Sequence, residues 1–281
     1  TQVRKNTASR EPISHKSFAV LTESAFLRLT GRRHMPFSCI AAVIPCIPHT
    51  LAQKGRPFFD IGEIIDHPVA VAFKRSGKAV VGETELAARY MRCPVVAVTG
   101  TNGKTTTVSM IEKILTEGGL KAHACGNIGA PMIGFVSLPE TEIAVAEISS
   151  FQLETLGSLC PHVGVVLNVT EDHLNRHYNM ENYIFLKGKL LKNSTEAEYA
   201  VLNYDDGIVR GFAEKTKARV LYFSVREKVH GAYLENGWLC FCGERILSES
   251  DLLTDGIHNI QNALAAIAAA KVMGISSESI A

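Results

Sequence analysis

PVVAVTGTNGKTTT, residues 94–107, is the stretch that decides the fold. Its apolar run Val95 to Val98 is typical of a central strand of a parallel sheet, buried on both faces. The glycine-rich turn 100–103 follows, and apolar residues at helical spacing then predict a helix from Lys104 to about residue 117, ended by Gly118-Gly119. Strand, glycine-rich turn, Lys-Thr and helix together predict a phosphate-binding loop.

The chemistry of this loop follows from its residue types. Its glycines let backbone N–H groups converge on an anion, and the start of the helix adds partial positive charge. Lys104 supplies a point charge, and the Thr105 hydroxyl can ligate Mg²⁺. The strict G-x-x-x-x-G-K-[ST] pattern is not met, because Val98 stands where its first glycine should be. An ordinary turn therefore remains the alternative.

Composition describes an ordinary globular protein of 281 residues, with 46% hydrophobic and 20% charged residues. The net charge of +1 gives no electrostatic argument for a nucleic-acid or membrane partner. No apolar run approaches the ~18 residues that a membrane helix needs. We expect small-molecule substrates, no nucleic acid, no membrane and a monomer.

The cysteines favour a reducing, cytoplasmic location, because no C-x-x-C pair is present. Cys240 and Cys242 alternate along a predicted strand, so the two thiols should share one face, and we expect packing rather than metal binding. The seven cysteines are Cys39, Cys46, Cys93, Cys125, Cys160, Cys240 and Cys242.

The likeliest domain boundary is Arg92-Cys93-Pro94, because proline discourages continuation of a helix. Residues 1–92 then form a divergent N-terminal domain, and residues 93–281 form a central domain. The first residues contain neither Met nor an apolar signal core, so we interpret them as an interior or remnant segment. Before the boundary, a strand over 78–81 and a helix over 83–90 are predicted.

After the loop the chain alternates strand and helix, which predicts an α/β fold: a mostly parallel sheet with flanking helices, preceded by a partial or degenerate smaller α/β domain. Asn236-Gly237 is a strong turn signal and predicts a hairpin. We expect strands over 122–125, 143–148, 163–169, 199–203, 220–225, 232–234 and 238–241, and helices over 151–159, 183–191 and 259–273.

Polar residues follow four of the predicted strands: Lys104 with Thr105, then Asn127, Glu147 and His173. Ligands bind at the carboxyl ends of strands in such sheets, so we expect these side chains to converge. Glu147 ends an apolar strand and is interpreted either as a Mg²⁺ ligand or as a cap of the helix that starts at Ser149. His173 is either a second ligand or an ordinary loop residue.

Three further residues keep two interpretations each. Taken alone, Lys187 is interpreted as a solvated charge on a predicted helix, which is the usual environment of a lysine. Asn259 and Asn262 are spaced i, i+3 on one helix face, so their amides can pair with the edge of adenine. The alternative is that Asn259 caps the helix.

These motifs resemble the Mur ligase family, the ATP-dependent enzymes that build the peptide stem of peptidoglycan precursors. The likeness covers residues 64–275 and is closest to the D-glutamate-adding branch. It rests on GTNGKTT at 100–106, GNIG at 126–129, EISSFQLE at 147–154 and NVTEDHL at 168–174. The P-loop alone is shared with folylpolyglutamate synthases, against which the run Ser149-Ser150-Phe151-Gln152 argues.

The resemblance implies ligation of D-glutamate to UDP-N-acetylmuramoyl-L-alanine through an acyl phosphate, with ATP and Mg²⁺ as cofactors. It implies catalytic roles for Lys104, His173 and Lys187, the last as a carbamylated lysine. Metal ligands would be Thr105, Glu147, His173 and Lys187. ATP would contact Gly100, Thr101, Asn102, Gly103, Lys104, Thr105, Thr106, Asn259 and Asn262, and the muramoyl substrate would contact Asn127, Ser149, Ser150 and Gln152.

Three departures from the family pattern qualify these expectations. Asn175 stands where an aspartate is usual. The first 60 or so residues lack the glycine-rich turn that receives the UDP group. A third domain is expected after the Asn259 helix, and without it we expect weak nucleotide binding and poor ligation. A noncatalytic ATP-binding remnant is the alternative function.

Overall fold

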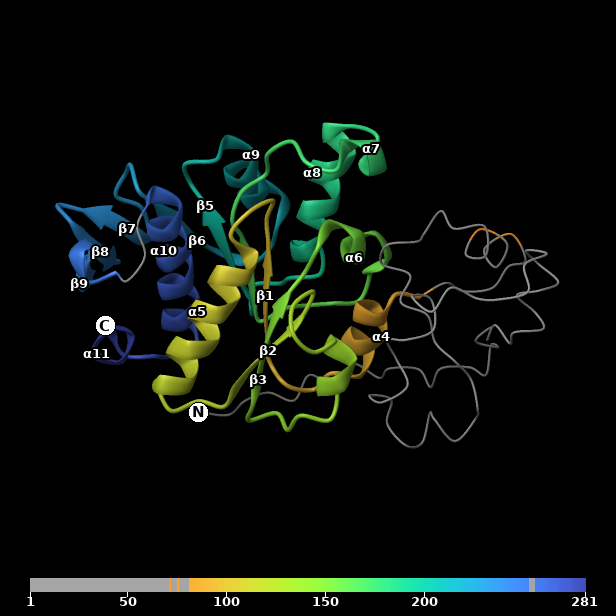
Figure 1. Cartoon of the computed structure of the whole chain (residues 1–281), viewed down its shortest axis with the longest axis horizontal. Helices are drawn as coiled ribbons and strands as arrows, with labels where there is room; N and C mark the ends of the chain where they lie inside the picture. Colours follow the sequence, from red (N-terminus) through yellow and green to blue (C-terminus); the bar gives the residue numbers. More distant parts are fainter. Residues whose placement is uncertain (1–70, 72–74, 76–80, 253–255) are drawn as a thin grey trace.

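The computed structural model describes residues 81–252 and 256–281, together with Val71 and Arg75 (Figure 1). Its centre is a nine-stranded sheet in the order β2-β3-β1-β4-β5-β6-β7-β8-β9. All neighbours from β2 to β7 pair in parallel, and β7, β8 and β9 pair antiparallel. The fold predicted from the sequence, an α/β protein with a mostly parallel sheet, is confirmed.

The predicted strands agree with those of the structure to within a few residues, whereas the last strand, Glu244–Ser248, was not predicted. In the structure they are β1 (Val95–Thr99), β2 (Ala122–Gly126), β3 (Ile143–Glu147), β4 (Val163–Val166), β5 (Tyr199–Asn203), β6 (Arg219–Ser224), β7 (Gly231–Glu235), β8 (Trp238–Phe241) and β9 (Glu244–Ser248). The hairpin at Asn236-Gly237 joins β7 to β8 as expected, and both turn residues have positive φ.

The helices are α4 (Glu83–Tyr90), α5 (Lys104–Glu117), α6 (Ser150–Thr155), α7 (Leu174–His177), α8 (Met180–Gly188), α9 (Gly207–Arg210), α10 (Ile257–Val272) and α11 (Ser277–Ile280). Short 3₁₀ helices are η2 (Met132–Phe135), η3 (Lys189–Leu191), η4 (Gly211–Lys215) and η5 (Glu249–Asp251). None of these described helices is long and apolar enough to cross a bilayer.

The sheet is buried on both faces, which explains its apolar strands. In β1, Val96 and Val98 belong to the core beneath α5 and α10, whereas Val95 and Ala97 belong to the core on the opposite face. α5 and α10 pack against each other over the first face (Figure 1). The second core includes residues of α4, α6 and α8. Two covered faces hold the strands rigid, so the loops at their ends have a fixed base.

Several expectations about the ends of elements are wrong. The helix predicted over 151–159 is only α6, because the chain becomes extended at Leu156. The strand predicted over 163–169 ends at Val166. Cys242 lies in the turn after β8 with a φ of 48°, so it is exposed, whereas Cys240 is buried. The two thiols therefore do not share a packed face. The strand predicted over 78–81 and everything proposed for residues 1–70 lie outside the described residues, apart from Val81.

Candidate functional site

The candidate site lies at the carboxyl ends of β1, β2, β3 and β4, which point to the same edge of the parallel sheet. The loop after β1 is tied to its neighbours by backbone hydrogen bonds. Ile148 N donates to Val98 O at 2.9 Å, and Leu167 N donates to Thr99 O at 3.0 Å. The predicted convergence of the four strand ends therefore rests on the sheet register itself.

The P-loop is fixed by a side chain that the sequence analysis did not single out. Asn168 accepts from Asn102 N at 2.8 Å and donates from Nδ2 to Asn102 O at 3.1 Å. Thr101 Oγ1 lies 3.2 Å from both Thr170 O and the Tyr183 hydroxyl. The P-loop is thus anchored to the β4 loop and to α8. Asn168 and Thr170 belong to NVTEDHL. From the residues alone, the only indication that this run could contribute to the site was its position after a predicted strand.

Lys104 opens α5 after Gly103, which adopts a φ of 85°. Its ammonium group donates to Gly100 O at 2.9 Å and to Thr101 O at 2.8 Å, so it folds over the loop. Burial lowers the pKa of this lysine, although Glu147 and Asp172 offset part of the effect. An anion placed over the loop would meet both this charge and the start of a 14-residue helix.

Glu147 is 2% exposed at the end of β3. Its Oε2 accepts from Thr105 Oγ1 at 2.7 Å, and its Oε1 accepts from Asn127 Nδ2 at 2.8 Å. The alternative in which Glu147 caps the next helix is wrong, because Ser149 and Gln152 form that cap themselves. The structure thus brings together three of the predicted site residues, from the start of α5, the end of β3 and the loop after β2.

This donor set fits Mg²⁺. A hydroxyl and a carboxylate supply hard oxygen donors, and Mg²⁺ is commonly bound by one or two carboxylates together with phosphate oxygens and water. Among the described residues, no three His, Cys, Asp or Glu side chains gather to hold a metal ion. Phosphate oxygens would therefore have to complete the coordination.

Lys187 is not the solvated charge that one interpretation expected, because it is 1% exposed. Its Nζ donates to Gly100 O at 2.8 Å and to Thr99 Oγ1 at 3.2 Å, directly under the P-loop. Burial, aided by the nearby charge of Lys104, lowers its pKa to about 7. A substantial fraction of this amine is therefore neutral and nucleophilic near neutral pH.

His173 lies farther out. Its side chain is 51% exposed, its Nε2 is 3.4 Å from Asp172 Oδ2, and its ring contacts Phe151. The backbone at His173 is left-handed, with a φ of 50°. The His173 side chain contacts Asp172 and Phe151. The Lys187 side chain contacts Gly100, Thr99 and the ring of Tyr183, so among the described residues the two predicted ligands of a second metal have no partner in common.

The predicted substrate residues after β3 are engaged internally. Ser149 and Gln152 form a capping box at the start of α6: Ser149 Oγ accepts from Gln152 N, and Gln152 Oε1 accepts from Ser149 N. Ser149 and Gln152 are half-buried. Ser150 is 4% exposed and its hydroxyl lies 3.0 Å from His177 Nε2. Asn127, by contrast, is exposed beside Glu147.

The two asparagines of α10 differ in environment. Asn262 is 5% exposed, and its Oδ1 accepts from Thr107 Oγ1 at 3.3 Å, so it supports the first turn of α5. Asn259 is half-buried. The alternative in which Asn259 caps the helix is wrong, because the N-cap is Gly256.

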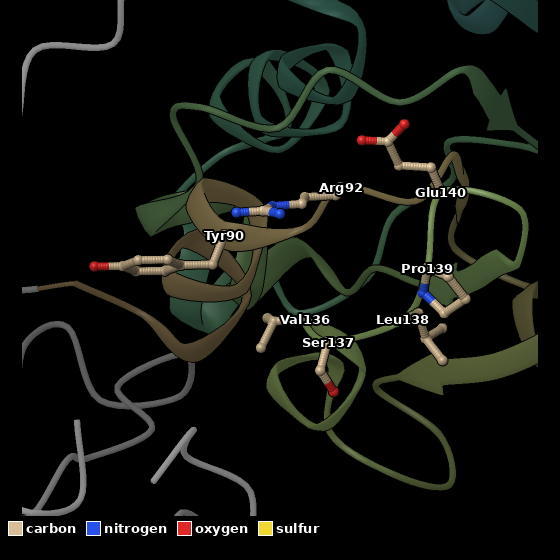
Figure 2. Close-up of a pocket in the computed structure, with 7 residues that line it drawn as sticks. All are labelled: Tyr90, Arg92, Val136, Ser137, Leu138, Pro139 and Glu140. Carbon is tan, nitrogen blue, oxygen red and sulfur yellow. The ribbon is translucent and has the colours of Figure 1, made fainter. Parts of the chain in front are cut away.

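One cavity of about 360 Å³ lies away from these residues, between the end of α4 and the loop after η2 (Figure 2). None of the predicted site residues contributes to it. Its lining consists of Tyr90, Arg92, Val136, Ser137, Leu138, Pro139 and Glu140.

Known proteins are similar to this chain in sequence. The family model described as Mur ligase middle domain matches residues 98–270. The chain is 41% identical over 222 residues to the UDP-N-acetylmuramoylalanine--D-glutamate ligase of Caldanaerobacter subterraneus subsp. tengcongensis, an alignment that covers 78% of this chain and 49% of that protein. It is 45% identical over 220 residues to the enzyme of the same name from Pelotomaculum thermopropionicum, with 76% and 48% covered.

Solved structures share the fold. The MurF ligase of Thermotoga maritima, crystallised in complex with ADP, superimposes with a TM-score of 0.53 at 20% identity, covering 69% of this chain and 49% of that one. The chain spans about half the length of the curated relatives that it matches.

Proposed function

The chain belongs to the Mur ligase family, and from this premise we propose that it binds Mg²⁺-ATP and serves a ligase that adds D-glutamate to UDP-N-acetylmuramoyl-L-alanine. The proposal rests on one observation: the Glu147 carboxylate accepts hydrogen bonds from both Thr105 and Asn127 beside the P-loop. Identities of 41% and 45% to enzymes named for D-glutamate addition favour this substrate over folate. On the same proposal, the protein acts in the cytoplasm as a monomer.

ATP would be held by the P-loop, residues 100–106. Backbone N–H groups and Lys104 would face the β- and γ-phosphates, after Lys104 exchanges its two carbonyl partners for phosphate oxygens. Thr105 and Glu147 would hold the Mg²⁺ that neutralises those phosphates. Asn259, half-buried on α10, would lie near adenine together with Asn262, which accepts from Thr107 in the first turn of α5.

The obstacle in this reaction is charge, because a phosphorylated carboxylate must meet a second anionic reactant. Preorganised cations are the usual remedy in a site shielded from water. Lys104 supplies one such charge. Lys187 would become a metal ligand together with His173 after its amine adds CO₂, and a pKa of about 7 favours the neutral amine that this addition requires. Asn127 and Ser149 would face the muramoyl substrate, with Ser150 and Gln152 behind them.

Binding and turnover by the 281-residue chain test the proposal. Calorimetric titration with a nonhydrolysable ATP analogue should show binding that requires Mg²⁺. ADP release should require both UDP-N-acetylmuramoyl-L-alanine and D-glutamate, and folate substrates should not replace them. Lys104→Ala should weaken analogue binding by about 10²-fold or more, since it removes the charge from the phosphate site.

Lys113→Ala is the matched control, because Lys113 lies on the same helix but is exposed and pairs with Glu117. It should leave binding unchanged. Equal binding by wild type and Lys104→Ala would overturn the phosphate role. Because the chain spans about half the length of its relatives, binding without turnover would support the ATP site and would fit either a noncatalytic nucleotide-binding module or part of a longer ligase.

A further inference from the structure

The short helix α7 is held in an unusual conformation. It has four residues, and the residues on both sides of it have positive φ: His173 at 50° and Tyr178 at 68°. Neither is glycine, so this backbone persists only because neighbouring groups enforce it. The question is which contacts hold α7, and therefore His173, in place.

One buried side chain makes most of these contacts. His177, the last residue of α7, is 0% exposed. Its Nε2 lies 3.0 Å from Ser150 Oγ, within hydrogen-bond distance, whereas its Nδ1 lies 3.4 Å from Glu154 Oε1 without forming a hydrogen bond, so the ring lies against one face of α6. Its carbonyl oxygen accepts from Asn182 Nδ2 on α8 at 3.2 Å. Arg176 adds an ion pair to Glu154 at 2.8 Å.

The same imidazole is part of a column of four rings. The ring of His173 contacts Phe151 with centroids 5.2 Å apart, Phe151 stacks on His177 at 5.3 Å with an interplanar angle of 25°, and His177 contacts Tyr183 at 5.2 Å. Exposure falls along this column, from 51% for the His173 side chain to 1% for Tyr183. His173 is therefore the exposed end of a column whose buried part lies against α6 and α8.

We propose that His177 is a positioning residue: held by Ser150 and in ring contact with Phe151 and Tyr183, it supports Phe151 and thereby fixes the ring and the left-handed backbone of His173. The consequence for metal binding rests on the proposed function, in which His173 is a ligand. Groups behind a metal ligand set its orientation, and their loss commonly weakens metal binding 10- to 100-fold.

The first measurement needs neither metal nor nucleotide. In the full chain, the ring-proton NMR signals of His173 should be displaced from those of a free histidine, because the ring lies against Phe151. In His177→Leu they should move toward the free values. His162→Leu is the control, since the ring of His162 packs on Tyr199 of β5 and makes no ring contact with the column in the part of the chain that the structure describes. It should leave the His173 signals in place.

The second measurement uses Mn²⁺ as the probe, in the presence of a nonhydrolysable ATP analogue, and follows the broadening of the His173 signals. His177→Leu should raise the Mn²⁺ concentration needed for half-broadening about tenfold. Circular dichroism and thermal unfolding identify folded variants. Ser150→Ala removes the hydroxyl that lies 3.0 Å from His177 Nε2 while keeping Phe151, and gives the same test if His177→Leu does not fold.

The outcomes separate the two proposals. A folded His177→Leu variant with unchanged His173 signals would overturn the positioning role, even if its melting temperature fell. If the His173 signals of His177→Leu move toward the free values but the Mn²⁺ concentration for half-broadening does not change, the positioning role is supported and the metal role of His173 is overturned. Wild type that binds no Mn²⁺ would contradict the proposed function, while the metal-free NMR signals would still decide the role of His177.

Discussion

At the scale of residues, the most telling feature is one carbonyl oxygen that two lysines share. Gly100 O accepts from Lys104 Nζ at 2.9 Å and from Lys187 Nζ at 2.8 Å. Burial lowers the pKa of both lysines, and the nearby charge of Lys104 lowers that of Lys187 further. A polyanion bound at the P-loop would favour the charged form of both lysines.

Lys187→Met should change how stability depends on pH. Between a folded-state pKa of about 7 and the ordinary 10.5, the unfolded chain holds a proton that the folded chain has released. The stability of wild type should therefore rise with pH across this window, relative to the variant, by about 1.4 kcal/mol per pH unit. Below pH 7 both states are protonated, and the difference should level off. Urea unfolding of both proteins in CO₂-free buffer at pH 6, 7, 8 and 9 measures it.

Wild type itself carries other titrating groups, but these cancel in the difference between the two proteins. A difference in the free energy of unfolding that stays constant from pH 7 to 9 would mean that Lys187 remains charged in the folded chain. The neutral amine invoked for CO₂ addition would then be absent.

At the scale of elements, α10 and α5 together support the P-loop. α10 is rich in alanine and packs closely on α5, and its buried Asn262 accepts from Thr107 in the first turn of α5. A Cβ on Gly103 would lie 2.3 Å from Asn262 Oδ1. The glycine is therefore required twice: by its φ of 85° and by the asparagine beside it.

Gly103→Ala and Gly119→Ala separate these two requirements. Gly119 has nearly the same φ, 89°, but a Cβ there would meet nothing within 4 Å. Gly119→Ala should cost about 1–2 kcal/mol of stability from backbone strain alone. Gly103→Ala should cost about 1–3 kcal/mol more, because Asn262 must move. Chemical unfolding of both variants provides the comparison.

Asn262→Ala, introduced into Gly103→Ala, should recover part of the extra cost, since the clash is with the asparagine side chain. Equal costs for the two glycine variants would show that Asn262 moves aside freely. It would then not act as a rigid support of the loop.

At the scale of the whole molecule, the sheet and the edge that carries the site could be predicted from the sequence. Short apolar strands alternating with helices leave few alternatives to a parallel sheet, and the strand ends then share one edge. The environments of single side chains could not be predicted. Lys187 is on a helix whose pattern does not reveal that the P-loop covers it, and its contacts lie 87 and 88 residues away in sequence.

The sequence pattern also does not reveal where the domain that contains the sheet begins. A boundary at residues 92–93 was predicted from proline alone, and it stays a prediction. α4 precedes that boundary, yet it packs against η2 and α6, and Leu86 and Ala87 join the second core. Glu85 accepts from Gly157 N at 2.7 Å and from Ser158 N at 2.8 Å, which fixes the turn after α6.

Two fragments test whether α4 belongs to this body. Residues 82–281 should fold and unfold in one cooperative transition. Residues 93–281 should be less stable by at least about 3 kcal/mol, because Leu86 leaves the core and the turn at 157–158 loses a buried carboxylate acceptor. Urea unfolding followed by circular dichroism gives both values. Glu85→Gln in the longer fragment isolates the second contribution and should cost about 1–2 kcal/mol.

Equal stability of the two fragments would place α4 outside the cooperative unit and support the boundary at 92–93. A large difference would move that boundary to the N-terminal side of α4. The stability of α6, which carries Ser150, would then depend on residues on both sides of Pro94.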